Sequence, residues 1–503
     1  MKTKVKALSL ILSLILLATG VFTSCDSGKT NEETTNGEET TVSGGSVIET
    51  ETIIETEVSN VPDIPVQDYG EQLYMMVYGG DSYVKFLYVE ESDASLLSQA
   101  VYERQMDLMN HLGVELVYIP TQGWLGYNEP FKQSIKNKDG AIDVFLPSSY
   151  LAIAEMIEEG YIYNLDNIDV FDFEADYWDM NFMDSIALDG HHYLGYSDFN
   201  VMKAHVVTYN KEMLAKYEDA LDESLYDSVY NYHWTIDEML ALANLVYIDA
   251  TGDGKTADDT FGISAKQWQP FVPFLMASDI RLVDMNEKGG YEVSVMTDVN
   301  APKTLALVDK LKGLAESDCA WFQWQDDPNV AVIPLHTNRV LMNLSFTSEL
   351  DQLLNYDVTF GILPYPMFDE AQKDVGYLSL NKDTYIMLPS YMRNEQMITE
   401  SIELLSYYSS DVRTAVFEKW LGKQAADAPD DVKMLNIVWD NLYSDFGYTY
   451  STIVGALNDN LYLLPTVTKA GANQSVASYI ASYSRVANNA IAKYMKRIQS
   501  LNK

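Results

Sequence analysis

The chain has 503 residues, and its 74 acidic and 33 basic side chains give a formal net charge of −41. A surface this negative repels nucleic acids and anionic lipid headgroups, which excludes DNA, RNA and polybasic lipid binding. Hydrophobic residues make up 47% of the chain, so it can form two or more globular domains with sizeable cores.

The N-terminal end carries the pattern of an exported protein. Three lysines within the first six residues precede an apolar run from Ala7 to Phe22, which is short for a spanning helix and is typical of an export signal. The following "FTSC" resembles a bacterial lipobox, although Phe22 stands where leucine is usual. We therefore expect residues 1–25 to be a lipoprotein signal peptide with Cys25 lipidated. An ordinary secretory signal with an incidental cysteine is the alternative.

The next segment, residues 26–65, has the composition of a tether. It is rich in Thr, Glu, Gly and Ser and contains no aromatic residue. Such a segment cannot bury enough apolar surface to offset its ordering entropy, which predicts a disordered linker. Together with the lipid, the linker would hold the folded body at the extracellular face of the cell membrane.

The body begins with alternating strand and helix patterns. "QLYMMVYGG" and "YVKFLYVEE" are β-like, while "ASLLSQAVYERQMDLMNHLG" has apolar residues at helical spacing and Gly113 as a stop. Strand patterns return in "VELVYIP" and "AIDVFLPSSY". This alternation predicts an α/β fold with mostly parallel sheets flanked by helices.

The second half continues the alternation and then becomes helical. "WTIDEMLALANLVY" predicts a helix, with Thr235 as its N-cap and Glu238 completing a capping box. "NAPKTLALVDKLKGLAES" predicts another helix, and "RVLMNLSFTSEL" and "VTFGILPYP" predict strands. After Pro389 the pattern is mainly helical. No segment beyond residue 25 is long and apolar enough to cross a bilayer.

The stretch "YIDATGDGKTADDTFGI", residues 247–263, has the spacing of a calcium loop. Oxygen donors at positions 1, 3, 5 and 7 and a closing carboxylate would come from Asp249, Thr251, Asp253, the carbonyl of Lys255, and Asp258 or Asp259. Thr260 stands where a full EF-hand has Glu, and the following segment is not helical, so we expect a structural calcium site and not a sensor. An Asp/Gly-rich turn that binds nothing is the alternative.

Aromatic residues are abundant, with eight tryptophans and 35 tyrosines. Flat rings beside hydrogen-bonding groups suit sugars, which have apolar C–H faces and polar edges. Core packing is the alternative for each ring. The tryptophans whose loop context favours a ligand contact are Trp124, Trp178, Trp268 and Trp324.

Catalytic signatures are absent from the sequence, which contains no HExxH, GxSxG, Walker or GxGxxG motif. Cys319 has no accompanying His or Asn motif and is expected to be a buried apolar side chain. His191 and His192 are adjacent, so in a strand they would point to opposite faces and could not easily share one ion. We therefore expect a binding protein and not an enzyme.

The order of these segments resembles family 1 extracellular solute-binding proteins, the lipoprotein receptors of bacterial ABC importers in the class of maltose-binding proteins. "DVFLPSSY" resembles the strand and ligand loop of the first lobe, and "HVVTYNKEML" resembles the segment that opens the second. "RVLMNLSFTSEL" and "VTFGILPYPMFDEAQ" resemble the return through the hinge. The likeness covers about residues 70–450.

This resemblance implies a two-lobed, periplasmic-binding-protein-like fold of type II, with hinge strands between the lobes. Lobe 1 would comprise residues 66–203 and 358–391, and lobe 2 residues 204–357 and 392–503. The cleft between them would close around a solute. By position, the resemblance places ligand contacts at Ser148, Ser149, Tyr150, Ser345 and Phe346. Asp81, Asp198 and Asn200 lie near predicted strand ends, and we expect them to accept hydrogen bonds from hydroxyl groups of the solute.

We therefore expect a monomeric, lipid-anchored protein that captures a solute, foremost an oligosaccharide, and delivers it to the permease subunits of an ABC transporter. A surface-tethered enzyme that degrades polysaccharide is one alternative. A receptor that reports its ligand to a sensor kinase is the other. The sequence does not identify the solute, and a peptide, a polyamine or a modified sugar is an alternative to an oligosaccharide.

Overall fold

The computed structural model describes residues 61–78, 81–121, 128–147, 153–200, 203–266, 271–323, 332–380, 384–413, 415, 429–454 and 476–501. The chain divides into two units, Met1–Val58 and Ser59–Lys503, and every described residue belongs to the second. The predicted signal peptide, the lipidation site Cys25 and most of the predicted linker therefore lie outside the described part. Ile64, near the end of that linker, is buried, so the ordered body begins before residue 66.

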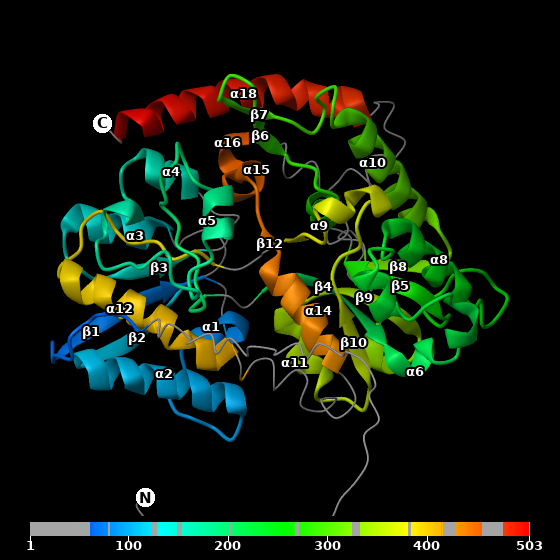
Figure 1. Cartoon of the computed structure of the whole chain (residues 1–503), viewed down its shortest axis with the longest axis horizontal. Coiled ribbons are helices and arrows are strands. Elements are labelled where there is room, and N and C mark those ends of the chain that lie inside the picture. The colour runs from blue at the N-terminus through cyan, green and yellow to red at the C-terminus, as the bar shows by residue number, and fades with distance from the viewer. Residues whose placement is uncertain are drawn as a thin grey trace, which may run out of the picture. The chain divides into compact units, whose positions relative to one another are not determined.

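Three parallel strands form the first sheet, in the order β2-β1-β3. They are β1 (Glu71–Val77), β2 (Val114–Pro120) and β3 (Val144–Leu146). Parallel strands need a crossover connection, and helix α2 (Leu96–Leu112) supplies it between β1 and β2. Helix α2 packs against β2, and α12 (Glu395–Tyr407) packs against α2 (Figure 1).

Helix α2 ends at Gly113, as its sequence predicts, and it begins at a serine cap that the sequence analysis did not single out. The side chain of Ser95 accepts a hydrogen bond from the backbone N–H of Ser98 at 3.1 Å. Gly113 has a φ of 61° and donates its N–H to the carbonyl of Met109 at 2.8 Å. Glycine enters this left-handed region without the steric cost of a Cβ, so it ends α2 and turns the chain into β2.

The segment after β1 corrects one prediction. The β-like pattern "YVKFLYVEE" predicts a strand, but the structure has helix α1 (Asp81–Leu87) over its first part. Val84 and Leu87 lie one helical turn apart, and both are buried. A short apolar run of this kind fits a helix as well as a strand, so periodicity alone could not decide.

Five strands form the second sheet, in the order β10-β4-β9-β5-β8. Their bounds are β4 (His205–Asn210), β5 (Phe261–Lys266), β8 (Ala320–Gln323), β9 (Val340–Phe346) and β10 (Phe360–Leu363). Strands β9, β5 and β8 are parallel, whereas β4 is antiparallel to both of its neighbours. Helices α8 (Ile236–Val246) and α10 (Ala301–Glu316) pack against β5 and β8. The predicted α/β class, with parallel strands flanked by helices, is confirmed.

Strand β5 approaches helix α8 closely at Gly262. A Cβ at this position would lie 2.2 Å from the Cα and 2.3 Å from the carbonyl oxygen of Ala243. Because the obstacle is backbone, Gly262→Ala is expected to push β5 and α8 apart and to lower the free energy of unfolding by about 1–3 kcal/mol.

Gly313 in α10 provides the matched control, since a Cβ there would meet no atom within 4 Å. Gly313→Ala is expected to leave stability unchanged or raise it by up to about 1 kcal/mol, because alanine favours the helix. Urea unfolding followed by circular dichroism measures both variants. Equal stability of the two variants would contradict the close approach at Gly262.

The remaining elements include the mainly helical C-terminal region that the sequence predicts. The longest, α18 (Val476–Leu501), packs against α16 and β7 (Figure 1). The other helices and strands are α3 (Asn128–Asn137), α4 (Ile153–Glu158), α5 (Met180–Ser185), α6 (Lys211–Leu214), α7 (Leu225–Tyr230), α9 (Phe271–Ala277), α11 (Leu350–Leu353), α14 (Pro429–Asp440), α15 (Phe446–Thr449), α16 (Ser451–Val454), β6 (Val283–Met285), β7 (Tyr291–Val293), β11 (Ser379–Leu380) and β12 (Leu442–Tyr443). Within the described ranges, no helix combines the length and apolar character that a membrane span requires.

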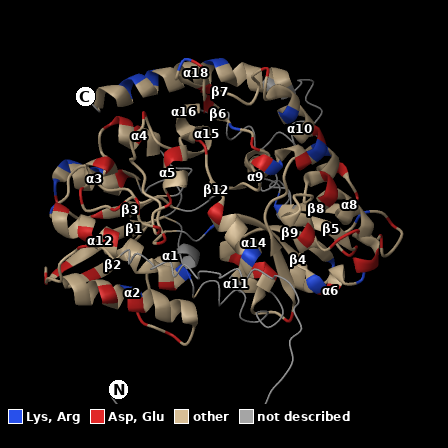
Figure 2. Cartoon of the chain, viewed as in Figure 1, with Lys and Arg blue, Asp and Glu red and all other residues tan. Residues whose placement is uncertain are grey.

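The boundaries of the two lobes stay a prediction. Strand β10, from the segment 358–391 predicted for lobe 1, pairs with β4 in the five-stranded sheet. Helix α12, from the segment predicted for lobe 2, packs against α2 beside the three-stranded sheet. Asp and Glu residues are spread over helices around both sheets, so the acidic residues are not confined to one region of the described chain (Figure 2).

Candidate functional site

A cavity of about 440 Å³ brings together Trp178 and Asp198, two of the predicted ligand residues. Its lining comes from segments far apart in the chain: 173–181, 197–198, and Arg413 with residues from the end of α14 to β12. We call this cavity the aromatic–acidic pocket. It offers rings, carboxylates and one guanidinium to a ligand, which is the mixture that hydroxyl-rich solutes require.

The aromatic side of this pocket is a cluster of packed rings around Trp178. The ring centroid of Trp178 lies 5.1 Å from that of Phe171 and 5.3 Å from that of Phe173, the latter in an edge-to-face arrangement. Trp178 is 4% exposed, so most of its side chain packs against protein, as the packing alternative expects. It also lines the pocket, and a contact between Trp178 and a ligand stays a prediction.

A buried carboxylate from α12 fixes this aromatic cluster. Glu403 accepts hydrogen bonds from the hydroxyl of Tyr177 at 2.6 Å, the indole N–H of Trp178 at 3.0 Å and the backbone N–H of Asp172 at 3.1 Å. Glu403 has no exposed surface, and burial raises its pKa although these donors work in the opposite direction. Glu403 acts on the pocket through Tyr177 and Trp178.

The polar side of the pocket is acidic. Burial raises the pKa of Asp198 to about 6, even though Arg413 lies 3.4 Å from its Oδ1 and favours the charged form. Burial also raises the pKa of Asp179, whose side chain caps α5 by accepting from the N–H of Phe182 at 2.9 Å. A poorly solvated carboxylate accepts hydrogen bonds strongly from a ligand hydroxyl, while its charge disfavours anionic solutes.

Of the other predicted ligand residues, the three whose side chains the structure describes, Asn200, Ser345 and Phe346, are not among the described lining of this pocket. Asn200 is buried: its Oδ1 accepts from the N–H of Ser197 at 3.0 Å, and its Nδ2 donates to the carbonyl of Thr384. Asn200 thus fixes the chain at the entry to β4. Phe346 is also buried, with its ring centroid 4.4 Å from that of His205.

Ser345 lines a separate cavity of about 270 Å³ beside β9. Its hydroxyl lies 3.1 Å from that of Thr208, and the cavity also contains the stacked rings of His336 and Tyr356. Whether Ser345, Phe346 or Asn200 contacts a ligand stays a prediction. The side chain of Asp81 and the residues Trp124, Ser148, Ser149, Tyr150, Trp268 and Trp324 lie outside what the structure describes.

Three residues of the pocket region were missed by the sequence reasoning. Arg413 and Trp439 line the pocket, and Glu403 holds its aromatic cluster. A tryptophan in the last turn of α14 was a signal that could have been noticed. No sequence signal connects Arg413 to Asp198 or Glu403 to Trp178, because more than 200 residues separate each pair.

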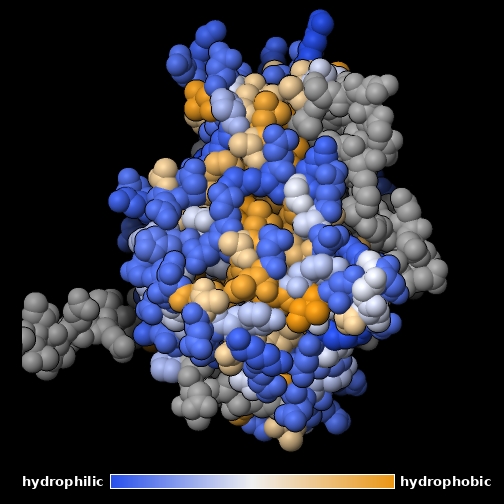
Figure 3. All heavy atoms as spheres, turned by 90° about the vertical axis from the view of Figure 1, so that its right-hand side faces the viewer, coloured by the Kyte–Doolittle hydropathy of each residue, from blue (hydrophilic) through white to orange (hydrophobic). Residues whose placement is uncertain are grey.

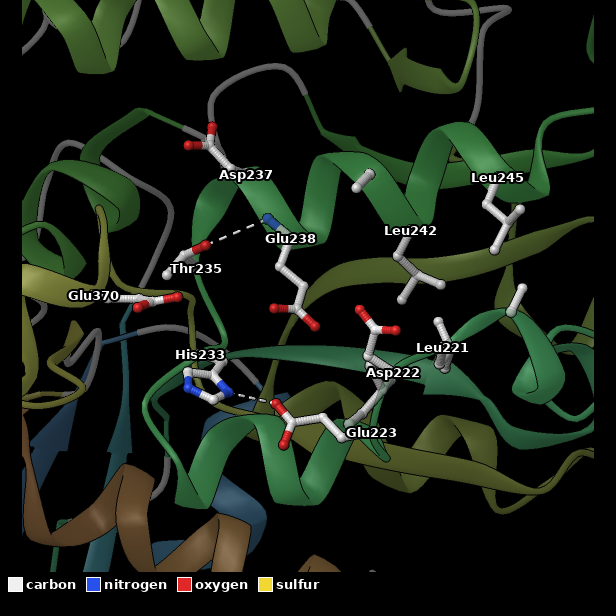
Figure 4. Close-up of a pocket in the computed structure, with 13 residues that line it drawn as sticks. Leu221, Asp222, Glu223, His233, Thr235, Asp237, Glu238, Leu242, Leu245 and Glu370 are labelled. Atoms are coloured by element: carbon white, nitrogen blue, oxygen red, sulfur yellow. Dashed lines mark hydrogen bonds and ion pairs between the residues drawn. The ribbon is translucent and has the colours of Figure 1, made fainter.

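A larger cavity of about 830 Å³ lies beside α7 and α8 and has a different chemistry (Figure 4). Five of its lining residues are acidic: Asp222, Glu223, Asp237, Glu238 and Glu370. The rest of the lining is four leucines, two alanines, His233 and Thr235, and none of its described lining residues is Phe, Tyr or Trp. The face that carries α8 shows hydrophobic residues gathered among hydrophilic ones (Figure 3). Without rings to stack on a sugar, this cavity fits a neutral oligosaccharide less well than the aromatic–acidic pocket.

The predicted calcium loop is a compact turn closed by the Ile248–Thr260 bridge. Asp249 accepts backbone N–H groups of Gly252 at 2.6 Å and Gly254 at 3.1 Å, and the first of these lowers its pKa most. Asp259 is buried and accepts from Ala250 at 3.0 Å and Thr256 at 2.7 Å.

These bonds shape the loop without an ion. Among the residues described, no three His, Cys, Asp or Glu side chains converge as a metal site. Oδ2 of Asp249 and the two carboxylate oxygens of Asp259 each accept one described hydrogen bond and keep a second lone pair, whereas Oδ1 of Asp249 accepts two. The Thr251 hydroxyl oxygen and the Lys255 carbonyl oxygen are further candidate ligands. Calcium binding by this loop stays a prediction.

Cys319, the one cysteine that the structure describes, is buried at the start of β8. Burial raises the pKa of its thiol, and its sulfur lies 3.1 Å from the hydroxyl of Ser317. A raised thiol pKa disfavours the nucleophilic thiolate, which agrees with the predicted packing role.

A mixed α/β chain with a three-stranded and a five-stranded sheet, and with a pocket lined by rings and carboxylates, fits a protein that binds solutes. Residues 106–424 match the family described as bacterial extracellular solute-binding protein. Because this match covers more than half of the chain, the chain belongs to that family. No curated protein sequence matches the chain.

Solved structures agree with this assignment at the level of the fold. One is the ABC substrate-binding protein Lmo0181 from Listeria monocytogenes in complex with cycloalternan, with a TM-score of 0.52 and 12% identity over 85% of this chain and 98% of that one. Another is the GacH receptor of Streptomyces glaucescens, solved unliganded and with acarbose and an acarbose homolog, with a TM-score of 0.51 and 15% identity over 85% and 98% of the two chains. The first was solved with cycloalternan and the second with acarbose, and at 12% and 15% identity the likeness to this chain is one of fold.

Proposed function

We propose that this protein captures a neutral oligosaccharide in the aromatic–acidic pocket and delivers it to an ABC importer. The observation that carries the proposal is the meeting of Trp178, Asp198 and Arg413 around one cavity. Rings next to carboxylates and a guanidinium match the apolar faces and hydroxyl edges of a sugar. The similar proteins solved with cycloalternan and acarbose support this ligand class.

The chemistry of capture is binding alone. Asp198 and Asp179 would accept hydrogen bonds from hydroxyls, Arg413 would donate to ring or hydroxyl oxygens, and the edge of Trp178 would contact C–H groups. Closure around a ligand is favourable when the closed state gains such contacts from both sides of a cleft. The transporter would recognise the closed form, and the solute would leave unaltered.

The proposed location is the extracellular face of the cell membrane, through a lipid on Cys25. The export signal, the lipobox-like "FTSC" and the tether composition of the following residues support this location. Metabolic labelling with a fatty-acid analogue tests it, with Cys25→Ser as the control expected to abolish the label. A label that persists in Cys25→Ser would contradict it.

A thermal-shift screen of neutral oligosaccharides, including cycloalternan and acarbose, followed by calorimetry, tests the function. Binding without release of reducing ends supports the receptor; release of reducing ends supports the enzyme alternative instead. Genes for two permease subunits next to this one would favour transport over sensing. A screen with no shift for any glycan would contradict the proposed solute class.

We also propose that the loop at Asp249–Asp259 binds calcium and stabilises the connection between α8 and β5. The expected result is a higher melting temperature in calcium than in chelator, because an ion that binds only the folded state stabilises it. Differential scanning fluorimetry measures the shift.

The variant Asp253→Asn separates the effect of a bound calcium ion on stability from the effect of the hydrogen bonds that hold the loop. Among described contacts, Asp253 accepts only from the hydroxyl of Thr251, whereas Asp249 holds the turn itself. The variant should lose most of the calcium-dependent shift while keeping the melting temperature seen in chelator. Identical curves for the wild type with calcium and with chelator would remove the calcium proposal.

A further inference from the structure

The histidine pair 191–192 forms a charge cluster next to the aromatic–acidic pocket. The Nδ1 atoms of His191 and His192 lie 3.0 and 2.7 Å from the two carboxylate oxygens of Asp166. The pair lies in a tight turn with an isolated bridge, Leu188–His191, and not in a long strand. The strand argument that separated the two rings therefore does not hold, and they share one acidic partner.

His192 has a second carboxylate partner on a different element. Its Nε2 lies 3.0 Å from Oδ1 of Asp184 in α5, while Asp166 belongs to the 3-10 turn Leu165–Asn167. A carboxylate can only accept, and a neutral imidazole carries a single N–H. Both contacts can be hydrogen bonds only when both ring nitrogens are protonated. In that form His192 ties α5 to the Leu165–Asn167 turn.

The charged groups that face His192 are Asp166, Asp184 and the neighbouring His191. Burial by itself lowers the pKa of His192, but the hydrogen bonds to Asp166 and Asp184 outweigh this effect, so the pKa lies above 6.5. Burial opposes ionisation of Asp166, but the hydrogen bonds from His192 leave its pKa below 3.8. The imidazole side chain is 11% exposed and Asp166 is 28% exposed, so solvent screens this contact little, whereas Asp184 is 68% exposed and its contact with His192 is screened more strongly.

A short path of contacts connects this cluster to the pocket. The ring centroid of Phe173 lies 6.1 Å from that of His192 and 5.3 Å from that of Trp178. Phe173 lines the pocket, and so do Met180 and Asn181, the first residues of the helix that carries Asp184. Release of Asp184 would therefore loosen a helix that forms part of the pocket wall.

We propose that His192 is a positioning residue that makes solute binding depend on pH: as an imidazolium it holds α5 and the Leu165–Asn167 turn behind the aromatic wall, and loss of its proton releases Asp184. This inference rests on the proposed function, because it regulates the same pocket. The sign follows from the raised pKa. The contribution to stability is complete below pH 6.5 and is lost as pH rises through the pKa of the folded state, and solute affinity falls in the same direction.

The first test uses the full chain without any solute. With ¹³C-labelled histidine, the Cε1–H signal of His192, assigned by its absence in His192→Gln, should titrate above 6.5. Asp184→Asn should lower the midpoint, because an amide can donate to a neutral Nε2. Asp184 is 68% exposed, so this variant should fold normally. His191→Gln is the matched control, since His191 does not contact Asp184, and should leave the midpoint above 6.5.

The second measurement tests whether the titration of His192 changes the surroundings of Trp178 in the pocket wall. The indole N–H signal of Trp178, assigned with Trp178→Phe, should shift with the His192 midpoint in the wild type and lose this shift in Asp184→Asn. A His192 midpoint at or below 6.5, or one unchanged in Asp184→Asn, would overturn the proposal. A Trp178 signal insensitive to the His192 titration would overturn the link to the pocket.

Affinity completes the test. For cycloalternan or acarbose as the probe, the ratio of wild-type affinity to Asp184→Asn affinity should fall by about fivefold between pH 6 and pH 9. The ratio is the readout because Asp198, with a pKa of about 6, titrates in both proteins. A ratio that is the same at both pH values would overturn the proposed regulation. Failure of both probes to bind at either pH would count against the proposed function, and the two titrations would still decide whether His192 controls α5.

Discussion

Replacing Asp198 with asparagine is expected to weaken oligosaccharide binding by about tenfold to a hundredfold. The carboxylate lies in the aromatic–acidic pocket with 13% of its side chain exposed, next to Arg413. A hydrogen bond from a ligand to a charged acceptor contributes about 1.5–3 kcal/mol, and an amide oxygen is a weaker acceptor. Calorimetric titration with a glycan from the screen measures the change.

The same variant is expected to be more stable than the wild type at neutral pH. In the wild type, the folded state raises the pKa of Asp198 from 3.8 to about 6. The contribution of Asp198 to stability is therefore complete below pH 3.8 and is lost as pH rises through about 6. This difference corresponds to about 3 kcal/mol at neutral pH, which Asp198→Asn would recover in part, since Arg413 loses its partner. Urea unfolding at about pH 4 and about pH 7 measures the effect.

Asp169→Asn is the control for this prediction. It removes the same charge from an exposed residue outside the described lining of the pocket. Neither affinity nor the pH dependence of stability should change by more than a small amount. If Asp198→Asn binds as the wild type does, or if Asp169→Asn weakens binding equally, the assignment of Asp198 to the ligand site is wrong.

Glu403→Ala is expected to lower the free energy of unfolding by about 3–5 kcal/mol. The change leaves two buried donors, the Tyr177 hydroxyl and the Trp178 indole N–H, and the partly buried backbone N–H of Asp172 without their acceptor. An unsatisfied buried donor costs about 1–3 kcal/mol, and the costs of neighbouring groups overlap. Solute affinity should fall as well, because the aromatic cluster loses its anchor.

The variant Glu403→Gln keeps the volume of the side chain, so it measures the loss of hydrogen-bond acceptors without the loss of packing. The amide oxygen can still accept from Tyr177 and Asp172, but the amide nitrogen would face the indole N–H of Trp178, donor against donor. A smaller loss of about 1–2 kcal/mol is expected. Glu395→Ala, at an exposed position of the same helix, is the control and should cost less than about 0.5 kcal/mol. A loss in Glu403→Ala no larger than in Glu395→Ala would contradict the anchor role.

Local patterns determined the elements with strong signals at both ends. Helix α2 has a serine cap, a helical apolar stripe and a left-handed glycine, and the interactions that these residues make lie within one turn of the chain. The Thr235 cap of α8 is confirmed in the same way, since its hydroxyl accepts from the N–H of Glu238 at 3.3 Å. The segment at α1 lacked such end signals, and packing against the rest of the body decided its helical form.

The sequence by itself also determined the class. The alternation of strands and helices, the acidic charge and the order of the family-like segments predict an α/β solute-binding protein, and the family match and the similar folds confirm it. For the pocket, loop context and strand ends predicted Trp178 and Asp198, because such positions in an α/β fold are exposed to ligands.

Only the tertiary structure decided which residues meet around that pocket. Arg413 reaches Asp198, and Glu403 reaches Trp178, across more than 200 residues of chain, and no local pattern encodes such a contact. The same holds for His192, whose two acidic partners come from separate elements that fold back on one turn. Spacing along a chain limits what neighbouring side chains can do, whereas the charge state and burial of a site depend on groups that packing brings together.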